Sequence, residues 1–404
     1  MRHRTAVMLT RGQFGYLRGV FLIASLSLCL SGCQLESQTM VDDEGARESD
    51  FDWRVPASIP LPVEPEDNPM TEAKFQLGRH LFYDARLSVN GEISCASCHH
   101  QSKAFSDGIQ RPIGATGEVH PRNSQSLTNS AYFNNLTWGN PALATIEQQI
   151  MLPLFGDNPI EHGIDESNFE QIIMTVQADE TYQRLFLNAF PEQDDPLWGD
   201  LAWDNVVKAI GSFVRGMTSF NSAFDRGDLS ASARRGEALF NSERLECFHC
   251  HDGYNFSDAT IDRGVAFLEP KFHNTGLYNI DGMGAYPEPN TGRHEVTGNP
   301  DHMGQFRTPS LRNVAVTAPY NHDGSVATLE EVIRNYARGG RVIATGENAG
   351  DGRISPFKDG VLVPFRISDA EVDDLVAFLE SLTDHDFLTD PRFSNPWEPT
   401  GENL

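Results

Sequence analysis

The chain has 404 residues, which is enough for two ordinary domains that each bury a core. Its 31 basic and 57 acidic residues give a formal net charge of −26 at pH 7. A surface of this charge repels nucleic acid and anionic lipid headgroups, so the composition excludes a nucleic-acid-binding protein.

Residues 1–32 have the pattern of a secretory signal peptide. Four arginines precede an apolar run, Val20 to Leu30, that is too short to span a bilayer. Small residues then precede Cys33, as in the bacterial lipobox, so we expect cleavage before Cys33 and lipidation of this residue. The alternative is signal cleavage nearby with Cys33 left free. Gln34 comes next and favours an outer-membrane lipoprotein on the periplasmic side of the cell envelope.

The segment 33–66 is rich in Asp, Glu, Ser and Pro and has few apolar anchors. We expect it to be a flexible tether between the lipid and the folded part. Removal of the four leader arginines leaves 27 basic and 57 acidic residues, a net charge of −30. Contact with the membrane is therefore expected through the lipid anchor alone.

Two Cys-x-x-Cys-His sequences follow, Cys95–His99 and Cys247–His251. Each supplies two thiols at the spacing of the haem vinyl groups and an imidazole for the iron. A zinc half-site or a redox dithiol is the alternative for a single pair of cysteines. Zinc would leave both histidines unused, and a redox dithiol needs an alternating strand and helix pattern that is missing here. We therefore predict two covalent c-type haems, bound by Cys95, Cys98, His99, Cys247, Cys250 and His251.

Helical patterns precede both motifs, over residues 71–84 and 231–241. Each contains a glycine, Gly78 or Gly236, one turn before a Leu-Phe pair, which lets another helix cross closely. Further helices are expected over 201–220 and 368–382, and Thr328 and Ser368 each begin a capping box.

Long loops rich in Gly, Pro and Asn fill residues 101–145 and 252–325, as expected around a cofactor. The predicted fold is mainly α, with two tandem cytochrome c-like domains. The first covers residues 67–225 and the second covers residues 226–404.

From Phe75 to Thr383 the sequence resembles the bacterial dihaem cytochrome c peroxidases and their MauG-type relatives. The resemblance is carried by Trp138, Gln149, Pro153, Asn158–Glu161, Phe306–Asn313, Thr317–Gly324 and Tyr336–Gly340. It implies that His99 binds the iron of a peroxide-reactive haem and that Glu161 is the acid/base group on its open side.

The resemblance also assigns the neighbours of the haems. Gln149 and Pro153 would line the open side of the first haem, and Trp138 would carry electrons between the haems. A calcium ion would be held by Asn123, Thr317 and Pro319. One residue more separates Trp138 from Gln149 than the family pattern has, so Gln148 is a second candidate for the distal amide. Taken alone, each of these residues has an ordinary place on the surface, in a turn or in the core.

The second haem would take His251 and a further axial ligand. The peroxidases use a Met there and MauG-like enzymes use a Tyr, and the matching position is Tyr336. Core packing is the alternative role of Tyr336, and Met283 or Met303 would then be the alternative ligand. A phenolate lowers the potential of haem iron relative to a thioether.

Further stretches resemble the MbnH-type subgroup of this family, namely Phe272–Tyr278, Gly284–Pro287, Gly339–Arg341 and Asn348–Gly350. Members of that subgroup are paired with a copper-binding periplasmic protein, MbnP-like, and oxidise a tryptophan on it. The resemblance thus implies an enzyme that uses hydrogen peroxide to reach a high-valent dihaem state and oxidise an aromatic side chain of a partner protein.

Two other functions remain open at this stage. One is a peroxidase that reduces hydrogen peroxide to water with electrons from a small cytochrome. The other is a passive electron-transfer dihaem cytochrome, in which both irons are closed. His120 is the nearest candidate for a ligand that closes the first haem.

Overall fold

The computed structural model describes residues 51–199, 201–265 and 268–398. The expected signal peptide, the lipidation site Cys33 and residues 33–50 of the expected tether lie outside the described residues. All the described residues belong to one compact unit of the chain.

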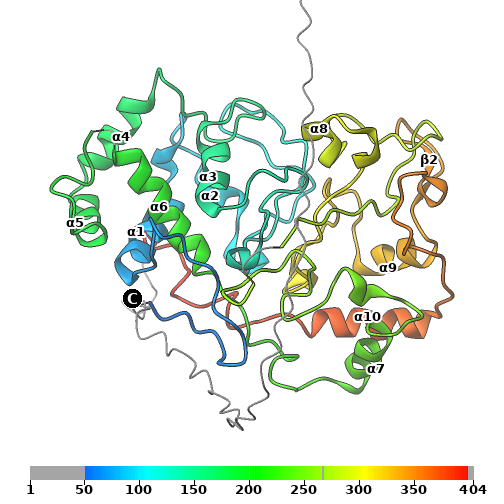
Figure 1. Cartoon of the computed structure of the whole chain (residues 1–404). Coiled ribbons are helices and arrows are strands. Elements are labelled where there is room, and N and C mark those ends of the chain that lie inside the picture. The colour runs from blue at the N-terminus through cyan, green and yellow to red at the C-terminus, as the bar shows by residue number, and fades with distance from the viewer. Residues whose placement is uncertain (1–50, 200, 266–267, 399–404) are drawn as a thin grey trace, which may run out of the picture. The chain divides into compact units, whose positions relative to one another are not determined.

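The described chain is mainly helical, as predicted (Figure 1). Its α-helices are α1 (Glu72–Phe82), α2 (Cys95–Cys98), α3 (Ile146–Phe155), α4 (Phe169–Gln177), α5 (Glu180–Ala189), α6 (Leu201–Arg215), α7 (Ala231–Phe240), α8 (Arg293–Thr297), α9 (Leu329–Ala337) and α10 (Asp369–Glu380). Strands β1 (Val342–Ile343) and β2 (Gly350–Asp351) pair in antiparallel, with Val342 opposite Asp351. Within the described ranges, none of the helices has the length and apolar character needed to cross a bilayer.

The helix ends follow local sequence signals, with two differences from expectation. Helix α6 ends at Arg215, before Gly216, and does not continue to residue 220. The side chain of Ser368 accepts a hydrogen bond from the Glu371 N–H, and Glu371 caps the Ser368 backbone in return. Thr328 caps α9 in the same way, but Glu331 makes no return bond, so the expected capping box is only half formed.

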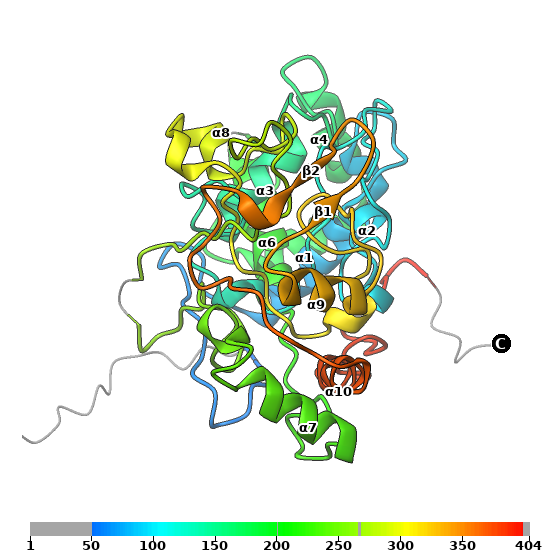
Figure 2. The same cartoon turned by 90° about the vertical axis from the view of Figure 1, so that its right-hand side faces the viewer.

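Gly78 and Gly236, the glycines predicted to allow close helix crossings, each lie between two packed helices. Helix α1 packs against α6, and α7 packs against α10, as Figure 2 shows for the second pair. A Cβ atom at Gly78 would overlap the backbone of Ala209, and one at Gly236 would overlap the backbone of Asp374. The absence of a side chain at these positions therefore allows each pair of helices to pack in direct backbone contact.

The apolar side chains form two main cores. The first contains α1 and α3 to α6, and it includes Phe75 and Phe213. The second lies between α7, α9 and α10, and it includes Phe240 and Phe378. Between α6 and α7 the chain passes from one core to the other. Met217 is the last residue of the first core before α7, and the buried residues of the second core begin with Phe240.

Two segments pack outside the division that the sequence suggests. Phe51 and Trp53 are buried in the first core, so the expected tether from residue 51 onward is packed against the fold. The chain after α10 returns to the first core, where Phe387 and Phe393 are buried beside α1 (Figure 1). The end of the expected second domain therefore stabilises the first core.

The glycine contacts predict a specific loss of stability. Gly78→Ala and Gly236→Ala should each lower the free energy of unfolding by about 1–3 kcal/mol, because the new Cβ overpacks the helix crossing. Gly360→Ala is the control, since a Cβ there meets open space. Denaturant unfolding of the haem-loaded protein, followed by circular dichroism, measures the change. Equal stability of all three variants would contradict the close crossing.

Candidate haem sites

Both Cys-x-x-Cys-His motifs hold their histidine in the same way. Nδ1 of His99 donates a hydrogen bond to the Phe105 carbonyl oxygen at 2.7 Å, and Nδ1 of His251 donates to the Phe256 carbonyl oxygen at 3.1 Å. Both phenylalanines have a left-handed backbone, with φ of 59° and 51°, so the chain folds back over each histidine. Burial lowers the pKa of both imidazoles. Each is therefore neutral and keeps its Nε2 lone pair free for an iron ion.

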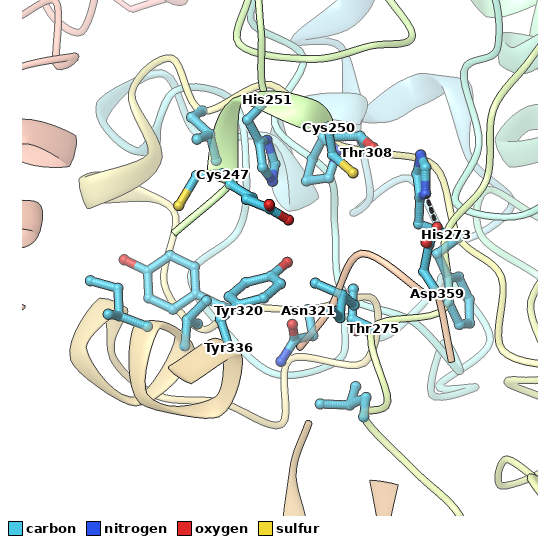
Figure 3. A pocket seen from close by; sticks show the side chains of 18 of the residues that line it. Cys247, Cys250, His251, His273, Thr275, Thr308, Tyr320, Asn321, Tyr336 and Asp359 are labelled. Carbon is cyan, nitrogen blue, oxygen red and sulfur yellow. Dashed lines mark hydrogen bonds and ion pairs between the residues drawn. The ribbon is translucent and has the colours of Figure 1, made fainter. Parts of the chain in front are cut away.

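A cavity of about 220 Å³ lies beside the second motif. Cys247, Cys250 and His251 line it, and most of its other walls are apolar. Figure 3 shows His251 on one side of this cavity and Tyr336 on the opposite side. Two thiols, a neutral imidazole and an apolar wall are what a covalently bound haem requires, so these residues fit that group.

Tyr336 is the predicted axial ligand that reaches this cavity. Burial raises the pKa of its phenol, with further contributions from Cys250 and Cys247. No described residue forms a hydrogen bond with its hydroxyl group, whereas the Tyr320 hydroxyl donates to the Val314 carbonyl oxygen at 3.2 Å.

The two methionines considered from the sequence do not line the cavity. Met283 is 70% exposed, and Met303 packs beside Tyr278 and Tyr286 in a third apolar cluster. Among the three candidates from the sequence, only Tyr336 lines this cavity.

Helix α3 carries the two residues expected beside the first haem. Gln149 and Pro153 are four residues apart on α3, so they lie on the same helix face. Gln148 has another task, because its side chain accepts hydrogen bonds from the backbone in the capping box of Thr145. Oε1 of Gln149 is buried and has no hydrogen-bond partner in the described part of the chain. A buried amide oxygen without a partner fits a site that a bound group completes.

Glu161 lies next to the same helix face. The N–H of His162 donates to the Pro153 carbonyl oxygen at 2.9 Å, which ties the segment of Glu161 to α3. The Glu161 carboxylate helps to raise the pKa of the Cys95 and Cys98 thiols, after the larger effect of burial, so it faces the first motif. The structure thus ties the segment of Glu161 to α3, the helix of Gln149 and Pro153, and the roles of these residues at the first haem stay a prediction.

Trp138 lines the cavity of the second motif and is hydrogen-bonded to the N-terminal part of the chain. Its indole N–H donates to the Asn123 carbonyl oxygen at 3.0 Å, and the Asn123 N–H donates to the His322 carbonyl oxygen at 2.9 Å. Asn123 also donates through Nδ2 to the Ile109 carbonyl oxygen at 2.7 Å, so its Oδ1 is left as an acceptor for a cation. Thr317 and Pro319 precede His322 closely, and their part in a calcium site stays a prediction.

Three residues of the second cavity were not singled out from the sequence. His273 lies between two carboxylates, 2.9 Å from Asp258 and 2.6 Å from Asp359. The His322 ring stacks on Phe306 with ring centroids 3.7 Å apart, and its buried Nε2 has no hydrogen-bond partner within the described ranges. The third residue is Arg307. Arg307 and His322 lie inside the motifs that carry the family resemblance, so their positions, but not their contacts, were visible in the sequence.

Arg307 is a buried cation between the two halves of the fold. It is 5% exposed, and its guanidinium lies 4.0 Å from the centre of the Phe133 ring. It donates hydrogen bonds to the Thr137 and Thr308 carbonyl oxygens and to Oε1 of Gln125. Burial lowers its pKa to about 9. No carboxylate among the described residues pairs with this guanidinium within 4.0 Å.

Comparison with known proteins agrees with this geometry. The family model of the di-haem cytochrome c peroxidases matches residues 72–234. The cytochrome-c peroxidase IdrP1 of Pseudomonas sp. (strain SCT) is 35% identical over 362 residues, which cover 84% of this chain and 89% of the relative. MauG, the methylamine utilization protein of Methylophilus methylotrophus, is 33% identical over 341 residues, which cover 82% and 87%.

This chain belongs to the di-haem cytochrome c peroxidase and MauG family. It is therefore a haem-dependent oxidoreductase that acts with peroxide, and the family carries two haems. A crystal structure of a MauG-like protein associated with microbial copper homeostasis matches with a TM-score of 0.84 at 50% identity, covering 86% of this chain and all of that protein. The diheme peroxidase BthA of Burkholderia thailandensis E264 shares the fold, with a TM-score of 0.61 at 21% identity.

The buried Arg307 gives a test of the contact between the two halves of the fold. Arg307→Met should lower the free energy of unfolding by about 3 kcal/mol, because three oxygen atoms each lose a donor worth about 1 kcal/mol. Arg353→Met is the control, since among the described residues the Arg353 side chain pairs only with Asp351, in a solvent-exposed ion pair that contributes little to stability. Denaturant unfolding of both haem-loaded variants measures the difference. Losses of the same size would show that Arg307 has no special structural role.

Proposed function

We propose that this protein uses hydrogen peroxide to oxidise an aromatic side chain, a tryptophan, on a partner protein. Each turnover takes two electrons from the partner and gives them to one peroxide molecule, which takes up two protons and leaves as two water molecules. The observation that carries the proposal is the place of Tyr336, opposite His251 across the second cavity, with no hydrogen-bond partner for its hydroxyl group among the described residues.

A tyrosine in this place favours an oxidase over a peroxidase that draws on a small cytochrome. A phenolate stabilises ferric iron and lowers its potential, which makes the second haem a poor electron acceptor from such a donor. The protein then needs no prior reduction before it reacts with peroxide. A low-potential second site can instead store an oxidising equivalent until the partner binds.

The two haems supply the redox chemistry when they are bound, and the surrounding residues divide the other tasks. Cys95, Cys98 and His99 hold one haem, and Cys247, Cys250, His251 and Tyr336 hold the other. Gln149 and Pro153 shape the open side of the first site, where Glu161 moves a proton between the two peroxide oxygens. Trp138, bonded to Asn123, is the electron conduit between the sites. Asn123, Thr317 and Pro319 hold a calcium ion between them.

The partner and the location are inferred together. The 50% identical MauG-like protein is associated with microbial copper homeostasis, which supports a copper-binding partner protein for this chain as well. The signal pattern and Cys33 support an outer-membrane lipoprotein that faces the periplasm. The partner would then be a periplasmic protein that meets the enzyme at the membrane surface.

A second function is favoured by one comparison. The 35% identical relative from Pseudomonas sp. is a cytochrome-c peroxidase, so reduction of peroxide with electrons from a small cytochrome is the alternative. That function requires a second haem that accepts an electron before peroxide reacts.

Hydrogen peroxide added to the diferric, haem-loaded protein without a reductant separates the two functions. The oxidase proposal predicts a long-lived two-electron-oxidised state with a near-infrared absorption from charge resonance between the haems. Tyr336→Met should lose this state and react only after reduction of the second haem, because a thioether raises its potential. Tyr320→Phe is the matched control and should behave as the wild type. If the wild type itself reacts only after reduction, the peroxidase alternative is right.

A further inference from the structure

His120 and Glu161 form a pair on the open side of the first haem site. Nε2 of His120 lies 3.4 Å from Oε1 of Glu161, and the two side chains are 24% and 35% exposed. The sequence suggested His120 only as a ligand that might bind the iron itself. The structure instead directs its Nε2 to the acid/base candidate.

The pair is built by a hairpin that docks on the segment of Glu161. Residues Ile113 and Val119 pair across this hairpin, and His120 follows directly. The Ala115 N–H donates to the Glu161 carbonyl oxygen at 2.7 Å. Oε2 of Glu118 accepts a hydrogen bond from the Ile160 N–H at 3.1 Å. These two hydrogen bonds fix the hairpin to the backbone of Ile160 and Glu161.

The hydrogen bonds at Nδ1 decide which ring nitrogen of His120 carries a proton. Nδ1 accepts a hydrogen bond from the Arg122 N–H at 3.1 Å, so in a neutral ring the proton is on Nε2. The Arg122 carbonyl oxygen lies 3.2 Å from the same Nδ1. It can accept a hydrogen bond from Nδ1–H if the ring becomes charged. Nε2 is the ring nitrogen that lies beside Glu161, 3.4 Å from its Oε1.

The groups around Glu161 favour its ionised form. Burial raises the pKa of this carboxyl group, but the hydrogen bond and the charge of His120 outweigh it, and the pKa is lowered. His162 from the same segment and His99 from the first motif contribute in the same direction. Cys95 and Cys98 face the carboxylate from the motif, and both become thioethers on haem attachment. His120 is thus the largest of the groups that keep Glu161 ionised.

We infer that His120 is a positioning residue that holds the Glu161 carboxylate in place beside bound hydrogen peroxide. The carboxylate takes a proton from one peroxide oxygen and returns it to the other as the O–O bond breaks. The departing oxygen leaves as the first water, and the carboxylate ends in its starting form. The haems, when bound, would supply the redox chemistry, and the other oxygen would leave as the second water with two protons and the two electrons of the donor. This inference rests on the proposed role of Glu161, but it holds for the oxidase and for the peroxidase alike.

The test is the pH dependence of the rate at which the diferric protein reacts with hydrogen peroxide, measured by stopped flow. In the wild type the rate should stay constant down to the acid range and fall only where Glu161 is protonated. His120→Ala should move this fall to higher pH, because the pKa of Glu161 rises when the imidazole no longer lies beside the carboxylate. His120→Gln keeps an N–H donor and should restore the wild-type profile.

Two controls make the result specific. Val119→Ala changes the same hairpin without touching Glu161 and should leave the profile unchanged, since Val119 is 48% exposed. Glu161→Gln should lower the rate by about 100-fold or more and remove the acid fall in every background. If the rate of His120→Ala falls at the same acidic pH as the rate of the wild type, the inference is overturned. A change of the first haem from low spin in the wild type to high spin in His120→Ala also overturns it, because His120 would then be an iron ligand.

The failure of the inference differs from the failure of the proposed function. If the diferric protein does not react without a reductant, the oxidase proposal fails, and the same pH comparison is made on the half-reduced protein. A shifted acid fall in His120→Ala then still supports the role of His120.

Discussion

Each haem site in this protein depends on one hydrogen bond, from Nδ1 of a motif histidine to the carbonyl oxygen of a phenylalanine. The bond fixes the tautomer and the orientation of the ring, so that Nε2 faces the place of the iron. The phenylalanines Phe105 and Phe256 have left-handed backbones in both copies. The close helix crossings at Gly78 and Gly236 are repeated in the same way, so the fold contains two equivalent platforms for haem.

What differs is the side opposite each histidine. Across from His251, helix α9 presents Tyr336, whose hydroxyl group has no partner among the described residues. At the first site, the amide of Gln149 on α3 and the carboxylate of Glu161 lie on two segments that are bonded to each other, and His120 lies 3.4 Å from the carboxylate. Under the proposed function, a closed site and an open site in one chain let peroxide react at one haem while the other stores an oxidising equivalent. Trp138 and the buried Arg307 lie between these two parts of the fold.

Local patterns in the sequence predicted the parts of this structure that depend on neighbours in the chain. The two motifs, the helix starts at Thr71 and Ser368, and the glycine crossings all follow from short-range geometry. The return of Phe387 and Phe393 to the first core did not, because no local signal marks contacts between residues some 300 positions apart. The pairing of His120 with Glu161 was missed for the same reason, since it requires a hairpin to dock on a distant segment. The position of Tyr336 came from the family resemblance, and the role of each site residue stays a prediction.

The central claim is that the two haems are unequal, one open and one closed by Tyr336. Low-temperature electron paramagnetic resonance of the diferric wild type and of Tyr336→Phe tests it most directly. The account predicts one high-spin and one low-spin haem in the wild type, and two high-spin haems in the variant, because phenylalanine offers no ligand atom. A low-spin signal that survives in Tyr336→Phe would contradict it and direct attention to His322, whose buried Nε2 also lacks a partner.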